Sequence, residues 1–108
     1  HGPVSVLVEH EVPPVVPTQT TMRNAYPNPF NVNGNTTIEV AVKEGDAGNV
    51  TIYNILGQVV KTYTVNPGNN NLTWNGKDSK GNTCGSGIYF YRLSTPSMNK
   101  TMKMVIVK

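Results

Sequence analysis

The stretch Asn24-Ala-Tyr-Pro-Asn-Pro-Phe-Asn31 decides how the rest of this sequence is interpreted. Each of its two prolines fixes a backbone φ angle and biases the residue before it toward an extended conformation. We interpret the stretch as a stiff corner that lets Tyr26 and Phe30 close one edge of a hydrophobic core. It therefore predicts the start of a β domain.

A second informative stretch, Gly87-Ile-Tyr-Phe-Tyr-Arg-Leu93, lies near the other end of the chain. Side chains alternate between the two faces of a strand, so Tyr89, Tyr91 and Leu93 share one face. The opposite face carries Ile88 and Phe90 and is therefore also apolar. This pattern predicts a central strand that is covered from both sides.

Short strands separated by turns account for the sequence between these stretches. Residues 36–43 alternate, with apolar side chains at 38, 40 and 42. Residues 49–53 and 58–65 predict two strands joined by a hairpin loop in which Gly57 takes a positive φ, with a bulge in the second strand. Two further strands are expected at 71–75 and 100–107. The pattern predicts an all-β protein, an immunoglobulin-like Greek-key β-sandwich of about seven antiparallel strands.

The first 21 residues differ in composition from the rest. Glu11-Val-Pro-Pro-Val-Val-Pro17 holds three prolines and predicts an extended, semi-rigid linker. Residues 3–9 alternate weakly and form either the last strand of a preceding domain or a strand that docks on this one. We therefore expect residues 1–21 to be the tail of a preceding domain plus a linker, and residues 22–108 to be one β-sandwich domain.

Composition and charge limit the possible functions. Charged residues make up 14% of the 108 residues and the net charge is +3. Residues 22–108 hold nine basic and four acidic groups, so this part carries 9 − 4 = +5. The basic residues are scattered and not clustered with exposed aromatics, so nucleic-acid binding is not expected. No apolar run reaches the length of about 18 residues that a membrane span needs.

The sequence offers no constellation for catalysis, a metal or a cofactor. Its two histidines, His1 and His10, lie outside the expected core. Cys84 is the only cysteine and is expected to pack as a small hydrophobe. Residues 78–82 favour an Asx-type turn over a calcium loop, because they lack the acid density of such loops. Trp74 and the tyrosines are expected to fill the core in preference to forming a sugar-binding platform. We therefore predict that the chain is not an enzyme.

Five blocks of sequence occur together in a recognisable order. The chain resembles the type A C-terminal sorting domain of the type IX secretion system, and it is similar to the related immunoglobulin-like domain of flagellar hook-cap proteins. The resemblance spans roughly residues 22–108. Its blocks are Tyr26-Pro-Asn-Pro-Phe-Asn31, Ile52-Tyr-Asn-Ile-Leu-Gly-Gln-Val-Val60, Thr73-Trp-Asn-Gly-Lys-Asp78, Gly87-Ile-Tyr-Phe-Tyr-Arg-Leu93 and Lys103-Met-Val-Ile-Val-Lys108. Cys84 departs from the small aliphatic residue that is common in the family at this position.

The resemblance implies a non-catalytic signal that directs a covalently linked upstream cargo across the outer membrane of a Gram-negative bacterium, by way of the periplasm. The implied partners are the outer-membrane secretion machinery and a sortase-like peptidase, which would cut the linker between about His10 and Asn24. The protein would be secreted or attached to the cell surface, and the domain itself is expected to be a monomer. The alternative is an accessory module that stays on a secreted enzyme and binds polysaccharide or acts as a spacer.

The residues expected to carry the sorting signal come from the stretches 24–31 and 87–93 and from the end of the chain. The terminal hairpin, residues 87–108, would be presented to the export machinery. Two tyrosines would hold it in register, and three lysines would offer exposed positive charge. The candidates are Tyr26, Pro27, Asn28, Pro29, Gly87, Tyr89, Tyr91, Lys100, Lys103 and Lys108.

Overall fold

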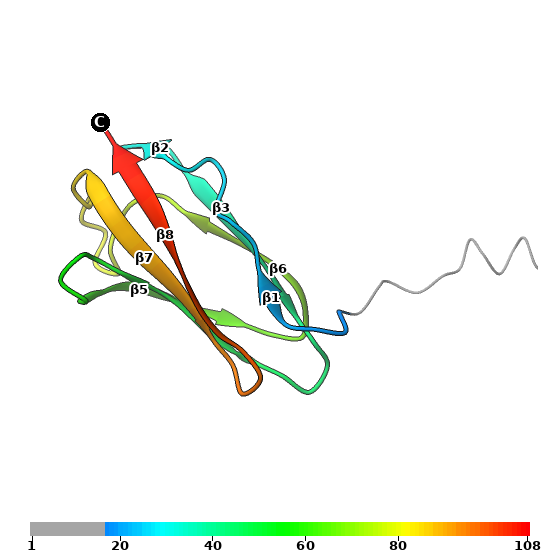
Figure 1. Cartoon of the computed structure of the whole chain (residues 1–108). Helices are drawn as coiled ribbons and strands as arrows, with labels where there is room; N and C mark the ends of the chain where they lie inside the picture. The colour runs from blue at the N-terminus through cyan, green and yellow to red at the C-terminus, as the bar shows by residue number, and fades with distance from the viewer. Residues whose placement is uncertain (1–16) are drawn as a thin grey trace, which may run out of the picture.

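Residues 17–108, the part of the chain that the computed structural model describes, form eight strands and no helix (Figure 1). The strand suggested for residues 3–9 lies outside these residues. The strands are β1 (Thr21–Met22), β2 (Phe30–Asn31), β3 (Thr36–Val42), β4 (Gly48–Tyr53), β5 (Val59–Val65), β6 (Gly68–Trp74), β7 (Gly87–Ser94) and β8 (Asn99–Val107).

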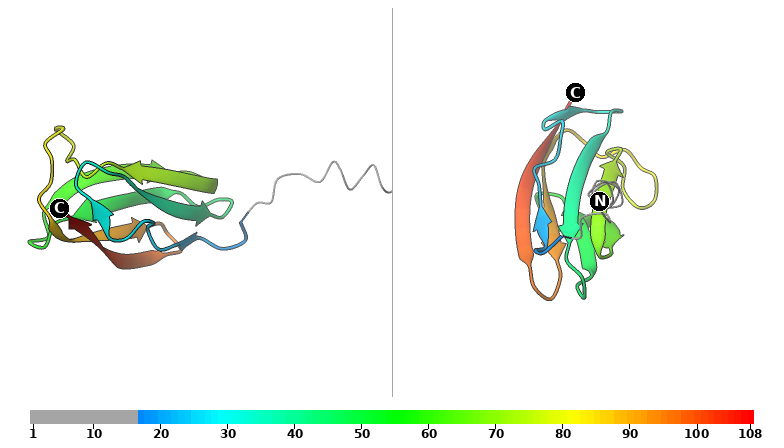
Figure 2. Two further views of the ribbon diagram at one scale, coloured as in Figure 1. Left: turned by 90° about the horizontal axis from the view of Figure 1, so that it is seen from above. Right: turned by 90° about the vertical axis from the view of Figure 1, so that its right-hand side faces the viewer.

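The strands form two sheets that lie face to face as two layers (Figure 2). One sheet has the order β1-β3-β6, and the other has the order β2-β8-β7-β4-β5. The all-β sandwich expected from the sequence is confirmed. There are eight strands where about seven were expected, because β1 and β2 are only two residues long.

One pairing differs from the antiparallel arrangement that the sequence suggested. The short strand β2 runs parallel to β8, with Phe30 opposite Ile106 and Asn31 opposite Val107. A two-residue strand has too little alternation to show its direction in the sequence. Its pairing follows from where the Tyr26–Phe30 corner lays the chain against the last strand.

The core lies between the two sheets and follows the alternation of the strands. The predicted inward residues of β3, Ile38, Val40 and Val42, are all buried. The other strands contribute Val50, Ile52, Val60, Val65, Leu72, Trp74, Tyr89, Tyr91, Leu93, Met104 and Ile106. Residues from both sheets therefore form one core, as a period of two on each strand requires.

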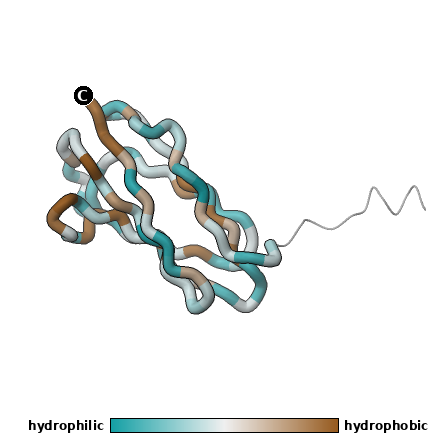
Figure 3. The backbone as a smooth tube through the Cα atoms, in the orientation of Figure 1, coloured by the Kyte–Doolittle hydropathy of each residue, from teal (hydrophilic) through white to brown (hydrophobic). Residues whose placement is uncertain are grey.

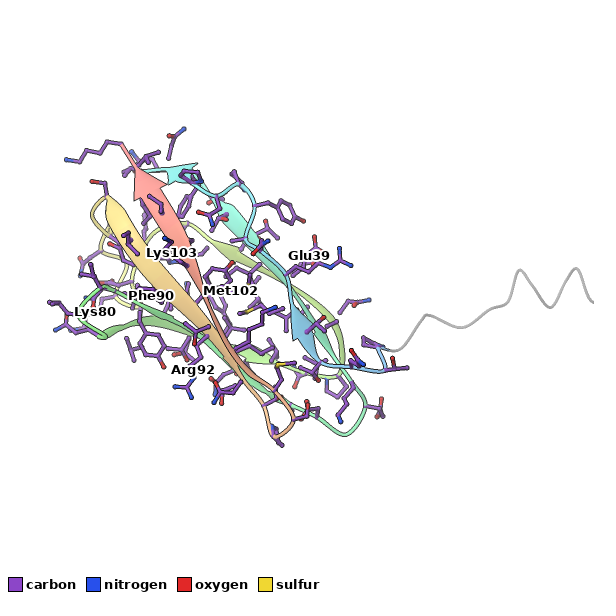
Figure 4. All side chains as sticks on the ribbon, viewed as in Figure 1. Glu39, Lys80, Phe90, Arg92, Met102 and Lys103 are labelled. Carbon is purple, nitrogen blue, oxygen red and sulfur yellow. The ribbon has the colours of Figure 1, made fainter. Side chains whose placement is uncertain are left out.

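The prediction that β7 is covered on both faces is wrong. Its inner residues Tyr89, Tyr91 and Leu93 are buried, but Ile88 is 38% exposed and Arg92 is exposed. β7 is central within its sheet, between β4 and β8, yet a two-layer sandwich has a second sheet on only one side. The outer face, which carries Phe90, Arg92 and, on β8, Lys103, therefore stays open (Figure 4).

The β4–β5 hairpin forms as the sequence indicated. Gly57 has a φ of 81°, in the left-handed region that favours glycine, and it closes the loop between the strands. The pairing shifts between Ile52 and Tyr53, so that Tyr53 faces Val59. This irregularity confirms the expected bulge. The hairpin lies at the opposite end of the sandwich from residues 17–20 (Figure 1).

Candidate functional site

The Tyr26–Phe30 corner is docked on the last strand of the chain. The side-chain amide of Asn28 donates a hydrogen bond to the Lys103 carbonyl (3.1 Å), and its Oδ1 accepts one from the Val105 backbone N–H (3.0 Å). This side chain occupies the free edge of β8 just before β2 begins to pair with it. The two stretches singled out from the sequence are therefore brought into direct contact.

The ring of Phe30 belongs to an aromatic cluster in the core. It meets Trp74 edge-on at a centroid distance of 5.6 Å, and Trp74 meets Tyr89 edge-on at 5.4 Å. Trp74 is fully buried, and its Nε1–H donates to the Lys77 carbonyl (2.8 Å). The expectation that Trp74 and the β7 tyrosines serve the core instead of an exposed platform is confirmed.

Tyr26 does not close the core, so that part of the prediction is wrong. Its side chain is 50% exposed, and its hydroxyl donates to Glu39 Oε2 (2.6 Å). This hydrogen bond, followed by partial desolvation, raises the pKa of Tyr26. The hydroxyl of Tyr26 finds its polar partner, Glu39, at the surface, whereas Phe30 has no polar group and packs in the core.

The two candidate tyrosines of β7 each join the strand to another segment. Tyr91 is fully buried, and its hydroxyl accepts a hydrogen bond from the Ala25 backbone N–H (2.9 Å). Tyr89 donates to the Gly85 carbonyl (2.7 Å) in the loop that leads into β7. Burial raises the pKa of both tyrosines. Tyr89 therefore stabilises the entry into β7, and Tyr91 joins β7 to the proline-rich corner.

Gly87 begins β7 with a φ of 141°, a conformation that residues with a side chain rarely adopt. It pairs with Ile106 near the end of β8. The candidate glycine is therefore a backbone requirement at the first residue of the terminal hairpin.

The three candidate lysines are exposed but do not share one face. Lys103 pairs with Phe90 and lies on the outer face of the five-stranded sheet. Lys100 pairs with Leu93, and its Nζ donates to the Met22 carbonyl (3.4 Å) in the opposite sheet. Lys108 follows the end of β8. Only Lys103 and Lys108 present charge that is not directed between the sheets.

A buried polar cluster near the start of the described chain was not predicted. Asp46 Oδ2 accepts hydrogen bonds from the Ser97 hydroxyl (2.6 Å) and the Thr20 hydroxyl (2.7 Å). Thr20 Oγ1 also accepts from the Lys43 N–H (3.1 Å). These hydrogen bonds, led by that from Ser97, lower the pKa of Asp46 to about 2. The cluster fixes the chain where it enters the sandwich.

The Asp78 loop is the Asx-type turn that the sequence favoured. Asp78 Oδ1 accepts hydrogen bonds from the backbone N–H groups of Lys80 and Asn82, both at 2.9 Å. Donation from Asn82 is the largest of the effects that lower the pKa of Asp78. Within residues 17–108, no three His, Cys, Asp or Glu side chains gather as a metal site would require.

Cys84 is half-buried and packs against the core cluster. Burial, reinforced by the negative charge of Asp78, raises the pKa of its thiol. A raised pKa disfavours the reactive thiolate, so the packing role expected for this cysteine is the one its surroundings support. In residues 17–108 there is no helix long and apolar enough to cross a membrane.

These features define a class: an all-β sandwich domain whose proline-rich corner is clamped onto its C-terminal strand. Residues 24–108 match the family described as the secretion system C-terminal sorting domain, and the chain belongs to this family. The resemblance to the type IX secretion system stated from the sequence is thereby confirmed. The domain is a signal for secretion and surface targeting across the outer membrane, and its family is a sorting family, not a catalytic one.

A solved structure supports the fold. The chain is similar to part of PorZ of Porphyromonas gingivalis, described as an essential bacterial surface component of the type-IX secretion system. The identity is 20% and the TM-score 0.56, over 82% of this chain and 11% of that one. The chain thus spans about a tenth of the length of PorZ, and at this identity the similarity concerns the fold alone. No curated protein matches the chain.

Proposed function

We propose that residues 22–108 act as a non-catalytic address that the outer-membrane secretion machinery reads on an upstream cargo. Residues 1–21 would be the tail of that cargo and its linker. The cargo would pass from the periplasm of a Gram-negative bacterium to the medium or the cell surface. The family match over residues 24–108 carries this proposal, because it includes both the proline-rich corner and the terminal hairpin.

The terminal hairpin of β7 and β8 is the part we expect the machinery to contact. Asn28 clamps the edge of β8, and Tyr91 joins β7 to Ala25, so the hairpin is presented as a fixed surface. Its exposed positive charge comes from Arg92, Lys100, Lys103 and Lys108, of which Lys100 also donates to the Met22 carbonyl. A rigid surface loses little conformational entropy on binding, which favours recognition of the folded domain.

A sortase-like peptidase would then cut the linker on the N-terminal side of Thr20. Proteases need an extended and accessible chain, and exposed segments are their preferred sites. Thr20 is buried and held by Asp46, and β1 pairs with β3 directly after it. These contacts protect residues 20–22 and leave the preceding proline-rich segment as the favoured site.

Surface delivery of a reporter tests the proposal. The full 108-residue chain is fused to the C-terminus of a reporter exported to the periplasm of a bacterium with type IX machinery. We expect the reporter outside the outer membrane, and in the periplasm of a strain that lacks the translocon. Export that continues in that strain, or a reporter that stays in the periplasm of the normal strain, would contradict the proposal.

A charge reversal tests which surface of the domain the secretion machinery contacts. The variant Lys103→Glu with Lys108→Glu should lower delivery strongly, because charge steers encounter and suppresses mismatched partners. The matched control is Lys61→Glu with Lys77→Glu, which reverses the same number of charges outside the hairpin and should leave delivery near normal. Equal delivery of both variants would exclude the hairpin lysines as contacts. Intact mass of the exported reporter shows whether the domain is removed; its retention would favour the accessory-module alternative.

A further inference from the structure

The tip of the β4–β5 hairpin exposes two adjacent bulky aliphatic side chains. Ile55 is 69% exposed and Leu56 is 79% exposed, and Val59, the first residue of β5, is 62% exposed. Figure 3 shows this apolar loop projecting at the end of the sandwich away from residues 17–20. Isolated exposed hydrophobics are ordinary, but a contiguous group on a projecting loop marks an interaction site.

Asn54 holds the tip in one conformation. Its Oδ1 accepts hydrogen bonds from the backbone N–H groups of Leu56 (3.0 Å) and Gln58 (2.9 Å). Its amide donates to Gln58 Oε1 (2.7 Å), its backbone N–H donates to the Gln58 carbonyl (3.0 Å), and its carbonyl accepts from the Gly57 N–H (2.9 Å). Backbone groups bonded within the loop cost little to remove from water. The backbone N–H groups of Leu56, Gly57 and Gln58 therefore keep their partners when the tip leaves water.

The hollow beside the tip holds one positive and one negative residue, and the excess of positive charge lies on the adjoining sheet, where Lys61, Arg92 and Lys103 are nearer to the tip than Lys100. Val59 and Lys80 line the same surface hollow beside the tip. Asp78 is the acidic residue of this hollow, and its carboxylate is occupied by hydrogen bonds from its own loop. Within the described chain, the strands of the five-stranded sheet contain no Asp or Glu and contain Lys61, Arg92, Lys100 and Lys103.

We propose that Ile55 and Leu56, supported by Val59, insert into the surface of an anionic phospholipid bilayer while Lys80 contacts its headgroups. Apolar side chains at the tip of a structure with a cationic surround favour the boundary between headgroups and acyl chains. This contact goes beyond the sorting role, because it would hold the domain at a lipid surface whichever secretion component reads the hairpin.

Two other occupants fit the tip less well. A stable protein–protein interface buries about 800 Å² on each partner, and a convex tip of three side chains offers far less area. A second copy of the chain would bring its own positive charge to a surface that already carries an excess of it. A bilayer needs no complementary pocket and attracts cations, so it suits both features.

Vesicle flotation of the purified full-length chain tests the inference. We expect the protein to float with vesicles that contain phosphatidylglycerol and to bind vesicles of phosphatidylcholine alone more weakly. The double variant Ile55→Ser with Leu56→Ser should reduce partitioning about a hundredfold, because the apolar surface of two inserted side chains is lost. Both positions are exposed, so the fold should persist, which is checked by the melting temperature. Equal flotation of the double variant and the wild type, or no flotation of the wild type, overturns the inference.

Two matched variants sharpen the test. Tyr26→Ser removes an exposed ring elsewhere on the surface and should leave flotation unchanged, which controls for non-specific adsorption. Lys80→Glu should weaken binding to the anionic vesicles only. As an independent readout, the emission of Ile55→Trp should shift to shorter wavelength when the anionic vesicles are added. Emission that does not shift would show that the tip stays in water and would overturn the proposed insertion.

Discussion

The two ends of the sandwich differ in what they do with their side chains. At the end where the described chain begins, Thr20, Asp46 and Ser97 direct their polar groups at one another. At the opposite end, Ile55 and Leu56 point their apolar groups at solvent. At the first end the polar groups are paired by hydrogen bonds, whereas the second end exposes apolar side chains to solvent. The end next to the linker is therefore fixed within the domain, and the apolar tip is the end that the proposed bilayer contact would use.

The aromatic cluster of Phe30, Trp74 and Tyr89 packs inside the end of the sandwich that carries the tip. A substitution in this cluster should reduce the free energy of unfolding the most. Trp74→Ala removes a fully buried ring that packs edge-on against Phe30 and Tyr89. We expect a loss of about 3–5 kcal/mol in the free energy of unfolding, measured by urea denaturation. The control Val59→Ala, at an exposed position of the same end, should change stability by no more than about 0.5 kcal/mol. A similar effect of both variants would contradict the role assigned to the cluster.

The sequence predicts much of the fold, because long strands with one buried face carry a clear alternation. Residues 36–42 and 87–93 show which of their side chains lie in the core. The outer face of β7 is harder to predict, since an apolar side chain facing solvent leaves no mark that separates it from a buried one. The same ambiguity made Tyr26 look like a core residue when its hydroxyl is bonded to Glu39.

The candidate site was less accessible to sequence reasoning than the fold. The proline-rich corner and the terminal hairpin were both identified, but their contact through Asn28 and β8 depends on the path of the chain between them. The Thr20–Asp46–Ser97 cluster joins residues that are far apart in the sequence, and each of them is an ordinary turn residue. Only the fold shows that they meet.

Removing the clamp that Asn28 forms on β8 should reduce the free energy of unfolding by an intermediate amount. Asn28→Ala loses both hydrogen bonds to the β8 backbone, and we expect a loss of about 1–2 kcal/mol in the free energy of unfolding. Faster hydrogen exchange at the Val105 amide, with little change at the Lys43 amide near Asp46, would show that only the β8 edge is loosened. Asn31→Ala, an exposed neighbour on β2, is the matched control and should be close to the wild type. Unchanged exchange at Val105 in Asn28→Ala would contradict the clamp.

The Thr20–Asp46–Ser97 cluster should affect how stability depends on pH, because its carboxylate is charged at neutral pH and becomes protonated in acid. The pKa of Asp46 is about 2 in the folded protein, below its ordinary value of 3.8, so folding favours the carboxylate. Its contribution to stability is complete above about pH 4 and is lost as the pH falls toward 2. Asp46→Asn keeps an acceptor oxygen but removes the charge, so the variant should be less stable than the wild type at pH 7, and the difference should shrink between pH 4 and pH 2 as the wild-type carboxylate is protonated. Asp78, whose pKa is also lowered, contributes to the slope in both proteins and does not affect their difference. Urea denaturation across this pH range is the measurement, with Glu44→Gln on the same loop as the control; parallel curves for the wild type and Asp46→Asn would show that the cluster does not hold the carboxylate in its charged form.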